Sequence, residues 1–211
     1  LPVRHGMTIG ELALMFRSER NLDLDLQVIE LENWDRSDFF DATGLRWVNP
    51  SPNMRSLTQA FLYPGIGMLE TSNLSVGRGT DTPFEVIGAP WIDPIELSHR
   101  MRSARLSGVT FVPIRFTPES SKYSGEQCGG VNFVITRRDE FDPLRMGLTL
   151  AIVLRDLYPD DWKGSDAYRL LGNRQTLDAI LDGASPAAVL SAASTGVPSF
   201  RQRRESFLIY R

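Results

Sequence analysis

A chain of 211 residues with 42% hydrophobic residues is long and apolar enough to bury a full core. Its 23 basic and 26 acidic residues nearly balance, which argues against nucleic acid or an anionic membrane surface as a partner. A single cysteine, Cys128, excludes an intrachain disulfide, and two histidines are too few to support a Cys/His zinc site. We expect no cofactor and no metal, and a small neutral or weakly charged ligand.

No apolar stretch approaches the roughly 18–20 residues that a spanning helix needs. The longest candidate, Met146–Leu154, is interrupted by Gly147 and Thr149, so we expect no membrane span. The chain starts at Leu1 without a signal-peptide pattern, which favours the later part of a longer polypeptide and leaves localisation open.

The N-terminal segment predicts a helix followed by a strand. Thr8 and Glu11 form a capping-box pattern ahead of apolar residues at helical spacing, which predicts a helix from about Thr8 to Arg20. Asp23–Leu31 is dense in apolar and β-branched residues and predicts a strand. The two together form an αβ unit.

Four aromatic residues lie in the irregular segment that follows, residues 33–52. They either stack on a sugar ring or pin the loop to the core, and burial statistics favour pinning. A short helix over Ser56–Leu62 is expected to end before Pro64.

The central region predicts two capped helices around two strands. Asp93 and Asp142 each precede a proline, a typical helix start, and we expect helices to about Arg105 and Tyr158. The expected strands and the shorter C-terminal helices are Val109–Phe116 and Val131–Thr136, then Asp166–Leu171, Gln175–Leu181, Pro186–Ala193 and Ser199–Tyr210.

The fold class that follows is α/β (α+β), with a mixed β-sheet, flanking helices, long glycine-rich loops and a helical C-terminal segment. We expect residues 1–160 to form the α/β domain and residues 161–211 to form a helical extension packed on it. A basic run, Arg201, Arg203 and Arg204, fits a phosphate patch or a solvated helix face, and the nearby Glu205 favours the second.

Two loops are the main functional candidates. Tyr63–Pro90 is rich in glycine, proline and small polar residues, which predicts backbone shape and polar contacts rather than an ordinary helix or strand. Its length argues against a plain spacer, and its apolar residues argue against disorder. Residues 117–130 form a second polar, glycine-rich loop between the predicted strands, and the two loops are placed to face one cleft.

Arg78 lies between two glycines, where a guanidinium can approach a carboxylate ligand bidentately. An ion pair with Glu70 or Glu85 is an equally good interpretation. Glu70 itself is flanked by hydroxyl and amide residues, as acid/base groups of glycosidases are, and is the catalytic candidate.

The remaining candidates are weighed against structural roles. Asn53 and Asn73 are either ligand amides or turn residues bonded to backbone. His5 is either a proton shuttle or a local hydrogen-bonding group beside a helix start. Tyr63 and Lys122, one from each loop, complete the set of substrate-binding candidates.

Four blocks carry a resemblance that composition does not show. In order, RHGMTIGELA, WVNPSPNM, YPGIGMLETSNLSVGRGTDTPFEVIGAPWID and FTPESSKYSGEQCGGV resemble the DUF1343 family, which includes exo-β-N-acetylmuramidases of the NamZ type. The resemblance implies removal of terminal N-acetylmuramic acid from cell-wall fragments, with a saccharide or muropeptide substrate.

The resemblance also implies a partner region. Family members are about twice this length and have an N-terminal Rossmann-like domain with a PEHG-type motif, whose glutamate is the leading catalytic candidate. That motif is absent from these 211 residues. The chain therefore resembles the C-terminal portion, contributing substrate binding beside an N-terminal catalytic portion; the alternative is an auxiliary glycan-binding or oligomerisation domain.

Overall fold

The structure is a computed structural model that describes residues 1–210. The chain separates into two compact units, Leu1–Arg46 with Ser194–Arg211, and Trp47–Ala193. Neither unit begins or ends at residue 160, where the sequence places its boundary.

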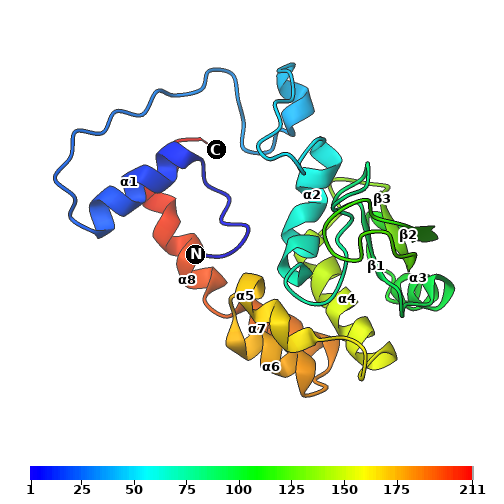
Figure 1. The fold of residues 1–211 in the computed structure, drawn as a ribbon. Helices are drawn as coiled ribbons and strands as arrows, with labels where there is room; N and C mark the ends of the chain where they lie inside the picture. Colours follow the sequence, from blue (N-terminus) through cyan, green and yellow to red (C-terminus); the bar gives the residue numbers. More distant parts are fainter. Residues whose placement is uncertain (211) are drawn as a thin grey trace. The chain divides into compact units, whose positions relative to one another are not determined.

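A three-stranded sheet lies at one side of the larger unit (Figure 1). Its strands β1 (Val86–Ala89), β2 (Val109–Phe116) and β3 (Cys128–Ile135) are ordered β1-β3-β2, and both pairings are antiparallel. The α/β fold class with flanking helices is confirmed, but the expectation of a mixed sheet is wrong, because no pair of these strands runs parallel. β2 has the predicted bounds.

β3 begins three residues earlier than predicted because two glycines allow its backbone to approach β1 closely. Gly129 and Gly130 pair with Ala89 and Gly88 of β1. A Cβ on Gly130 would lie 2.0 Å from the Ile87 carbonyl oxygen, so no larger residue fits this close approach. The glycines that resemble loop residues in the sequence are therefore strand residues in the fold.

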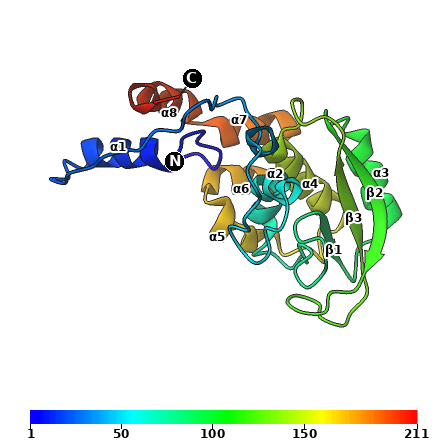
Figure 2. The ribbon, with the colours of Figure 1, turned by 90° about the horizontal axis from the view of Figure 1, so that it is seen from above.

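Three helices bury the apolar side of this sheet: α2 (Leu57–Ile66), α3 (Pro94–Ser103) and α4 (Pro143–Leu157). α3 packs against β2 and β3 (Figure 2). Its Ser98 hydroxyl donates to the Phe111 carbonyl at 2.8 Å. α2 and α4 cross where a Cβ on Gly147 would lie 2.3 Å from the Gly65 carbonyl oxygen. The predicted caps of α3 and α4 are confirmed, with the Asp93 and Asp142 carboxylates accepting first-turn N–H groups.

α2 extends past its predicted end. Pro64 lies inside the helix, where it removes one N–H donor from the ladder. Leu62 and Ile66 on either side of it are fully buried, and their packing holds the helical turn against that loss. The stop expected before Pro64 is thus wrong for a tertiary reason.

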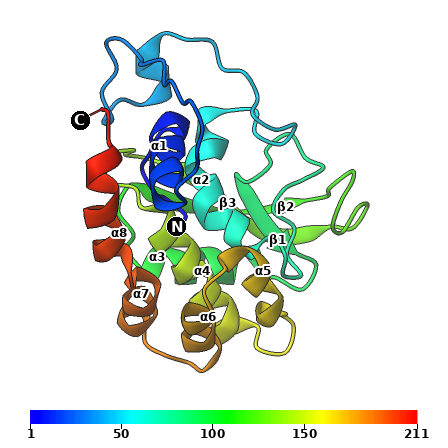
Figure 3. The same ribbon diagram turned by 90° about the vertical axis from the view of Figure 1, so that its left-hand side faces the viewer.

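Short helices complete the larger unit. They are η3 (Gly164–Ala167), α5 (Tyr168–Leu171), α6 (Arg174–Leu181) and α7 (Pro186–Ser194), visible together in Figure 3. Arg155 of α4 donates to the Ile180 carbonyl at 2.7 Å, which fixes the end of α6 to α4. The helices expected near residues 166, 175 and 186 are all present.

The loop Tyr63–Pro90 is less irregular than expected. Its first residues complete α2 and the 3₁₀ helix η2 (Gly67–Leu69), and its last residues form β1. Between them, Leu74, Val76 and Phe84 are at most 3% exposed. The segment is a buried part of the core as well as a loop, so the expectation that it avoids helix and strand is wrong at both ends.

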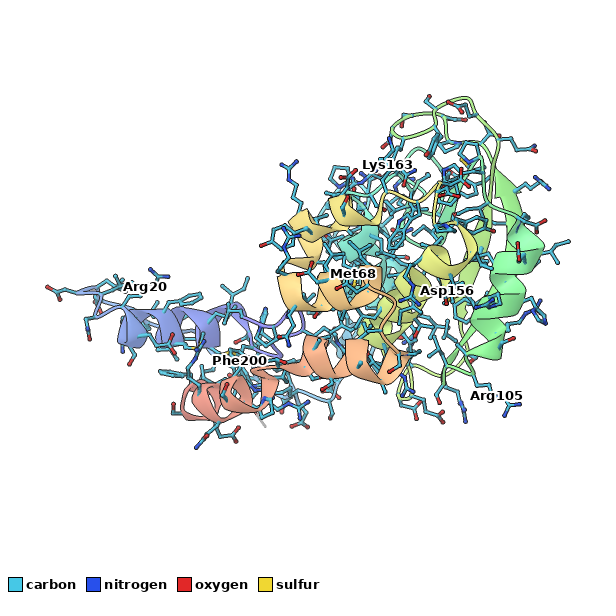
Figure 4. The ribbon with its side chains drawn as sticks, turned by 90° about the horizontal axis from the view of Figure 1, so that it is seen from below. Arg20, Met68, Arg105, Asp156, Lys163 and Phe200 are labelled. Atoms are coloured by element: carbon cyan, nitrogen blue, oxygen red, sulfur yellow. The ribbon has the colours of Figure 1, made fainter. Side chains whose placement is uncertain are left out.

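The smaller unit pairs α1 (Ile9–Glu19) with α8 (Val197–Arg204) and the 3₁₀ helix η4 (Glu205–Phe207). A small core of Met7, Met15 and Phe200 joins them, with Phe200 labelled in Figure 4. The capping box at Thr8 and Glu11 is confirmed. A second 3₁₀ helix, η1 (Phe40–Thr43), lies in the segment between α1 and the larger unit.

The basic run near the C-terminus is used locally. Arg203 pairs with Glu19 at 3.0 Å, and Arg204 donates to the His5 and Gly6 carbonyls. Two of its three arginines therefore bind protein groups, which fits neither a phosphate patch nor a purely solvated face.

The predicted strand at Asp23–Leu31 is not a strand in the structure. The segment runs as open coil after α1, with Ile29 81% exposed and Leu31 56% exposed. A strand requires a hydrogen-bonded neighbour, and this segment has none among residues 1–210. The αβ unit expected there is wrong for this chain taken by itself.

The aromatic residues of residues 33–52 were expected either to pin this segment to the protein or to stack on a sugar ring. Trp47 donates its indole N–H to the Met54 carbonyl at 3.2 Å, and Trp34 packs edge-on against Tyr210 at 4.9 Å. Both rings have protein partners, as pinning expects. No helix among residues 1–210 is long and apolar enough to cross a membrane.

Glu11 organises the smaller unit as a buried carboxylate. Its Oε1 accepts from Arg36 at 2.5 Å and from the Ile209 and Tyr210 N–H groups at 2.8 and 3.3 Å. Burial by itself raises the pKa of Glu11, but the hydrogen bonds from Arg36 and from the Thr8, Ile209 and Tyr210 backbone outweigh it and lower the pKa to about 2.

We expect Glu11→Gln to flatten the pH dependence of stability in acid. Because the folded pKa lies below the unfolded value near 4.5, the carboxylate stabilises the fold fully above pH 4.5 and loses this contribution as pH falls toward 2. The contribution is on the order of 3 kcal/mol. Urea unfolding at pH 7, 4 and 3 measures it.

The control is Glu30→Gln, which changes an exposed carboxylate of the same unit. It should leave the unfolding midpoints close to those of the unsubstituted chain. If the Glu11→Gln chain lost as much stability between pH 7 and pH 3 as the unsubstituted chain, Glu11 would not be the source of the pH dependence.

Candidate functional site

The candidate site is built on a turn that leaves the core immediately after η2. Glu70 is the first residue beyond this 3₁₀ helix, and the chain returns to the sheet through the bridge between Ser75 and Gly88. Gly77 and Gly79 have φ of 79° and 82°, which favour glycine. Glu70 therefore precedes the bridge, and Arg78 lies in the loop between the two bridged residues, Ser75 and Gly88.

Glu70 and Arg78 form an ion pair through Oε1 and Nε. The Arg78 guanidinium also lies 5.2 Å from the centre of the buried Phe84 ring. Of the two carboxylates expected as ion-pair partners, Glu70 is therefore the one that contacts Arg78. The pair is still accessible, with the two side chains 22% and 33% exposed for Glu70 and Arg78 respectively.

The ion pair leaves hydrogen-bonding capacity free. Among residues 1–210, Nη1 and Nη2 of Arg78 and Oε2 of Glu70 have no hydrogen-bond partner. Two guanidinium nitrogens side by side are the donor arrangement that binds a carboxylate. Nε and the Phe84 ring hold the guanidinium in place, which lowers the entropic cost of using it.

Lys122 reaches the same turn from the second loop. Its ammonium donates to the Glu70 carbonyl at 2.7 Å and to the Ser72 carbonyl. Burial lowers the pKa of Lys122, although the charges of Glu70 and Asp166 oppose this change. Lys122 therefore lies beside Glu70 and holds the turn through two of its three N–H donors.

Asn73 ties the turn to the segment after α4. Its Nδ2 donates to the Asp161 carbonyl at 2.8 Å, and its Oδ1 accepts the backbone N–H of Lys163, labelled in Figure 4, at 2.7 Å. The Tyr123 hydroxyl donates to the Asn73 carbonyl at 2.9 Å. Both ends of the Asn73 amide are thus engaged by backbone, which favours the structural interpretation.

The two glycine-rich loops meet, as expected. Glu119 N–H donates to the Gly79 carbonyl at 2.8 Å, and a Cβ on Gly79 would lie 2.4 Å from the Ser120 carbonyl oxygen. An open hollow of about 430 Å³ lies at this junction. It is lined by Arg55, Gly79, Thr80, Asp81, Phe116, Thr117, Glu119 and Ser120.

The hollow has the chemistry of a small polar ligand site. Hydroxyls, carboxylates, one guanidinium and one aromatic ring line it, which are the groups that bind sugar hydroxyls and sugar faces. None of these side chains is among the candidate residues expected from the sequence. The polar composition of residues 117–130 was a signal for three of them, Thr117, Glu119 and Ser120, whereas Arg55 has no sequence signal.

Other predicted residues lie apart from the ion pair or have separate partners. Tyr63 is 42% exposed at the end of α2 and packs edge-on against Phe84 at 4.9 Å, so it reaches the ring beneath Arg78. Asn53 makes a backbone contact of 3.5 Å to the Ser51 hydroxyl. His5 belongs to the smaller unit, where its Nδ1 accepts the Met7 N–H at 3.1 Å.

Other chemistry finds no support in these residues. Burial, with the charge of Glu126, raises the pKa of Cys128 to about 11, so the thiol is neutral near pH 7 and a poor nucleophile. Within residues 1–210, no group of three or more His, Cys, Asp or Glu side chains is placed to hold a metal ion.

Comparison with known proteins identifies the family. The protein-family model for the C-terminal region of the exo-β-N-acetylmuramidase NamZ matches residues 61–210. The family model for its N-terminal region matches residues 1–58. The chain belongs to the NamZ family. The peptidoglycan β-N-acetylmuramidase NamZ of Bacillus subtilis (strain 168) is 40% identical over 213 residues, which cover 100% of this chain and 51% of that protein. The chain thus spans about half the length of this curated NamZ relative.

Two crystal structures of DUF1343 proteins from Bacteroides fragilis NCTC 9343 are similar. BF0371 has a TM-score of 0.81 and 25% identity, covering 97% of this chain and 56% of that one. BF0379 has a TM-score of 0.72 and 26% identity, covering 98% and 56%. The resemblance to DUF1343 is confirmed, and the similarity to NamZ supports a peptidoglycan glycosidase family.

We expect Lys122→Met to destabilise the larger unit by about 1–3 kcal/mol, because two carbonyls lose their donor. Urea unfolding measures the change. Lys163→Met is the matched control, since the same substitution removes an exposed ammonium with no side-chain hydrogen bond among residues 1–210. Equal destabilisation by both would contradict a special role for Lys122.

Proposed function

We propose that this chain supplies the substrate-binding part of a glycoside hydrolase that removes terminal N-acetylmuramic acid from cell-wall fragments. Family membership supports the glycosidase class, and the B. subtilis relative is named as a peptidoglycan β-N-acetylmuramidase. The single observation that carries the substrate assignment is Arg78, which is anchored through Nε while Nη1 and Nη2 remain available.

The lactyl carboxylate distinguishes muramic acid from other amino sugars, and Arg78 is the group for it. A bidentate guanidinium–carboxylate contact is both strong and geometrically selective. Glu70 orients this guanidinium and offers Oε2 to a sugar hydroxyl. The hollow beside Gly79 takes the neighbouring part of the saccharide or muropeptide, with Phe116 offering a ring face.

The assignment of Arg78 is tested by ligand discrimination. We expect the chain to bind N-acetylmuramic acid at least about 10-fold more tightly than N-acetylglucosamine, which lacks the lactyl group, and Arg78→Ala to remove this preference. Titration calorimetry with both sugars measures the ratio. Arg145→Ala, which removes an exposed arginine of α4, is the control.

A preference that survives in Arg78→Ala would remove Arg78 from the site. A chain that binds both sugars equally well before substitution would contradict the muramic assignment itself. Circular dichroism of each variant reports whether the fold is retained.

Glu70 is tested as the catalytic candidate by activity. Because its Oε1 is held by Arg78, we expect Glu70 to bind substrate and not to act as the catalytic acid or base. Since the PEHG-type motif is absent from these 211 residues, we expect the chain to be inactive on a chromogenic N-acetylmuramic glycoside. The full-length B. subtilis relative serves as the active control. Hydrolysis by the 211-residue chain that disappears in Glu70→Gln would instead make Glu70 catalytic and overturn the purely binding role.

A further inference from the structure

The open coil after α1 has the properties of a strand without a neighbour. In residues 1–210, the backbone groups of residues 25–30 have no hydrogen-bond partner. The segment contacts the fold at its ends, where Leu24 N–H donates to the Leu22 carbonyl at 3.1 Å and Leu31 N–H donates to the Tyr210 hydroxyl at 2.8 Å. A row of free N–H and C=O groups is a template for strand pairing.

The side chains of this coil alternate between two faces, as they do in a strand. Leu26 and Val28 are half-buried, and a Cβ on Gly10 of α1 would lie 2.6 Å from Val28 Cγ1. Ile29 and Leu31, two residues apart, are exposed instead. One face therefore lies on a helix, while the other face and the backbone are open, which is the condition of a strand taken out of a helix-covered sheet.

The C-terminal tail fixes where this coil ends. The Tyr210 ring packs edge-on against Trp34 at 4.9 Å, and its carbonyl accepts from Arg36 at 2.9 Å. Arg36 in turn is bound to the buried Glu11. The coil is therefore anchored at its C-terminal end, which limits the entropy that pairing would cost.

We propose that residues 23–31 are a docking strand that adds to the edge of a β-sheet in the N-terminal region of a NamZ-family protein. The occupant follows from the comparisons, because the N-terminal family model matches residues 1–58 and this chain covers 51% of its B. subtilis relative. Parallel, in-register pairing with a second copy of the same segment is disfavoured, since Asp23, Asp25 and Glu30 would each lie opposite the same acidic residue.

The mode is strand addition, in which main-chain hydrogen bonds supply the affinity and alternate side chains supply the register. Ile29 and Leu31 would be covered on the face away from α1. The same sequence then forms a strand in the longer assembly and a coil in the isolated chain.

Amide hydrogen exchange tests the proposal in a chimera. The part of the B. subtilis relative on the N-terminal side of the matched 213 residues is joined to Leu1 of this chain. We expect amides within residues 25–30 to exchange at least about 100-fold more slowly in the chimera than in the isolated chain. Unchanged exchange in a folded chimera would overturn the proposal.

A proline pair provides the matched control within the chimera. Gln27→Pro removes an N–H from the proposed strand, and Arg46→Pro makes the same change at an exposed coil residue whose N–H has no partner among residues 1–210. Only Gln27→Pro should abolish the protection of the neighbouring amides. Retained protection in Gln27→Pro would contradict strand pairing.

If the chimera does not fold, the same hydrogen-exchange measurement is made on the full-length B. subtilis relative. The segment aligned with residues 23–31 must be slow to exchange there as well. Fast exchange of that segment in the folded relative would overturn the proposal for the family.

Discussion

The turn that presents Glu70 and Arg78 depends on one ammonium. Lys122 donates to the carbonyls of Glu70 and Ser72, two acceptors that the turn points inward and that no helix or strand satisfies. Carbonyls in such a position need a donor, because a buried backbone acceptor without one is costly. The Lys122 ammonium thus holds the backbone of the turn, and this fixes where the carboxylate of Glu70 meets the guanidinium of Arg78.

The rest of the site follows from close backbone approach. Gly79 lies so near Ser120 that a side chain would overlap it, and Gly129 and Gly130 approach β1 and the start of α3 in the same way. These contacts bring the second loop onto the first and leave the hollow at their junction. The glycines therefore serve packing between loops more than mobility of either loop, which suits a preformed ligand site.

Local signals were sufficient for the elements they control. The caps at Thr8, Asp93 and Asp142 predicted three helix starts, and each carboxylate or hydroxyl makes the expected bond. Pro64 failed as a stop signal because the burial of its neighbours outweighed one missing hydrogen bond. Asn73 and Lys122 were found by composition, but composition does not reveal whether an amide or an ammonium faces a ligand or a carbonyl.

By itself the sequence determined the capped helices, strand β2 and the family, because each depends on residues close in the chain or on a pattern long enough to be specific. Only the tertiary structure decided the role of Asn73, the hollow beside Gly79 and the state of residues 23–31. These depend on groups far apart in sequence: a carbonyl, a neighbouring loop or a partner strand. A strand pattern states a preference, and a hydrogen-bonded neighbour is what makes it a strand.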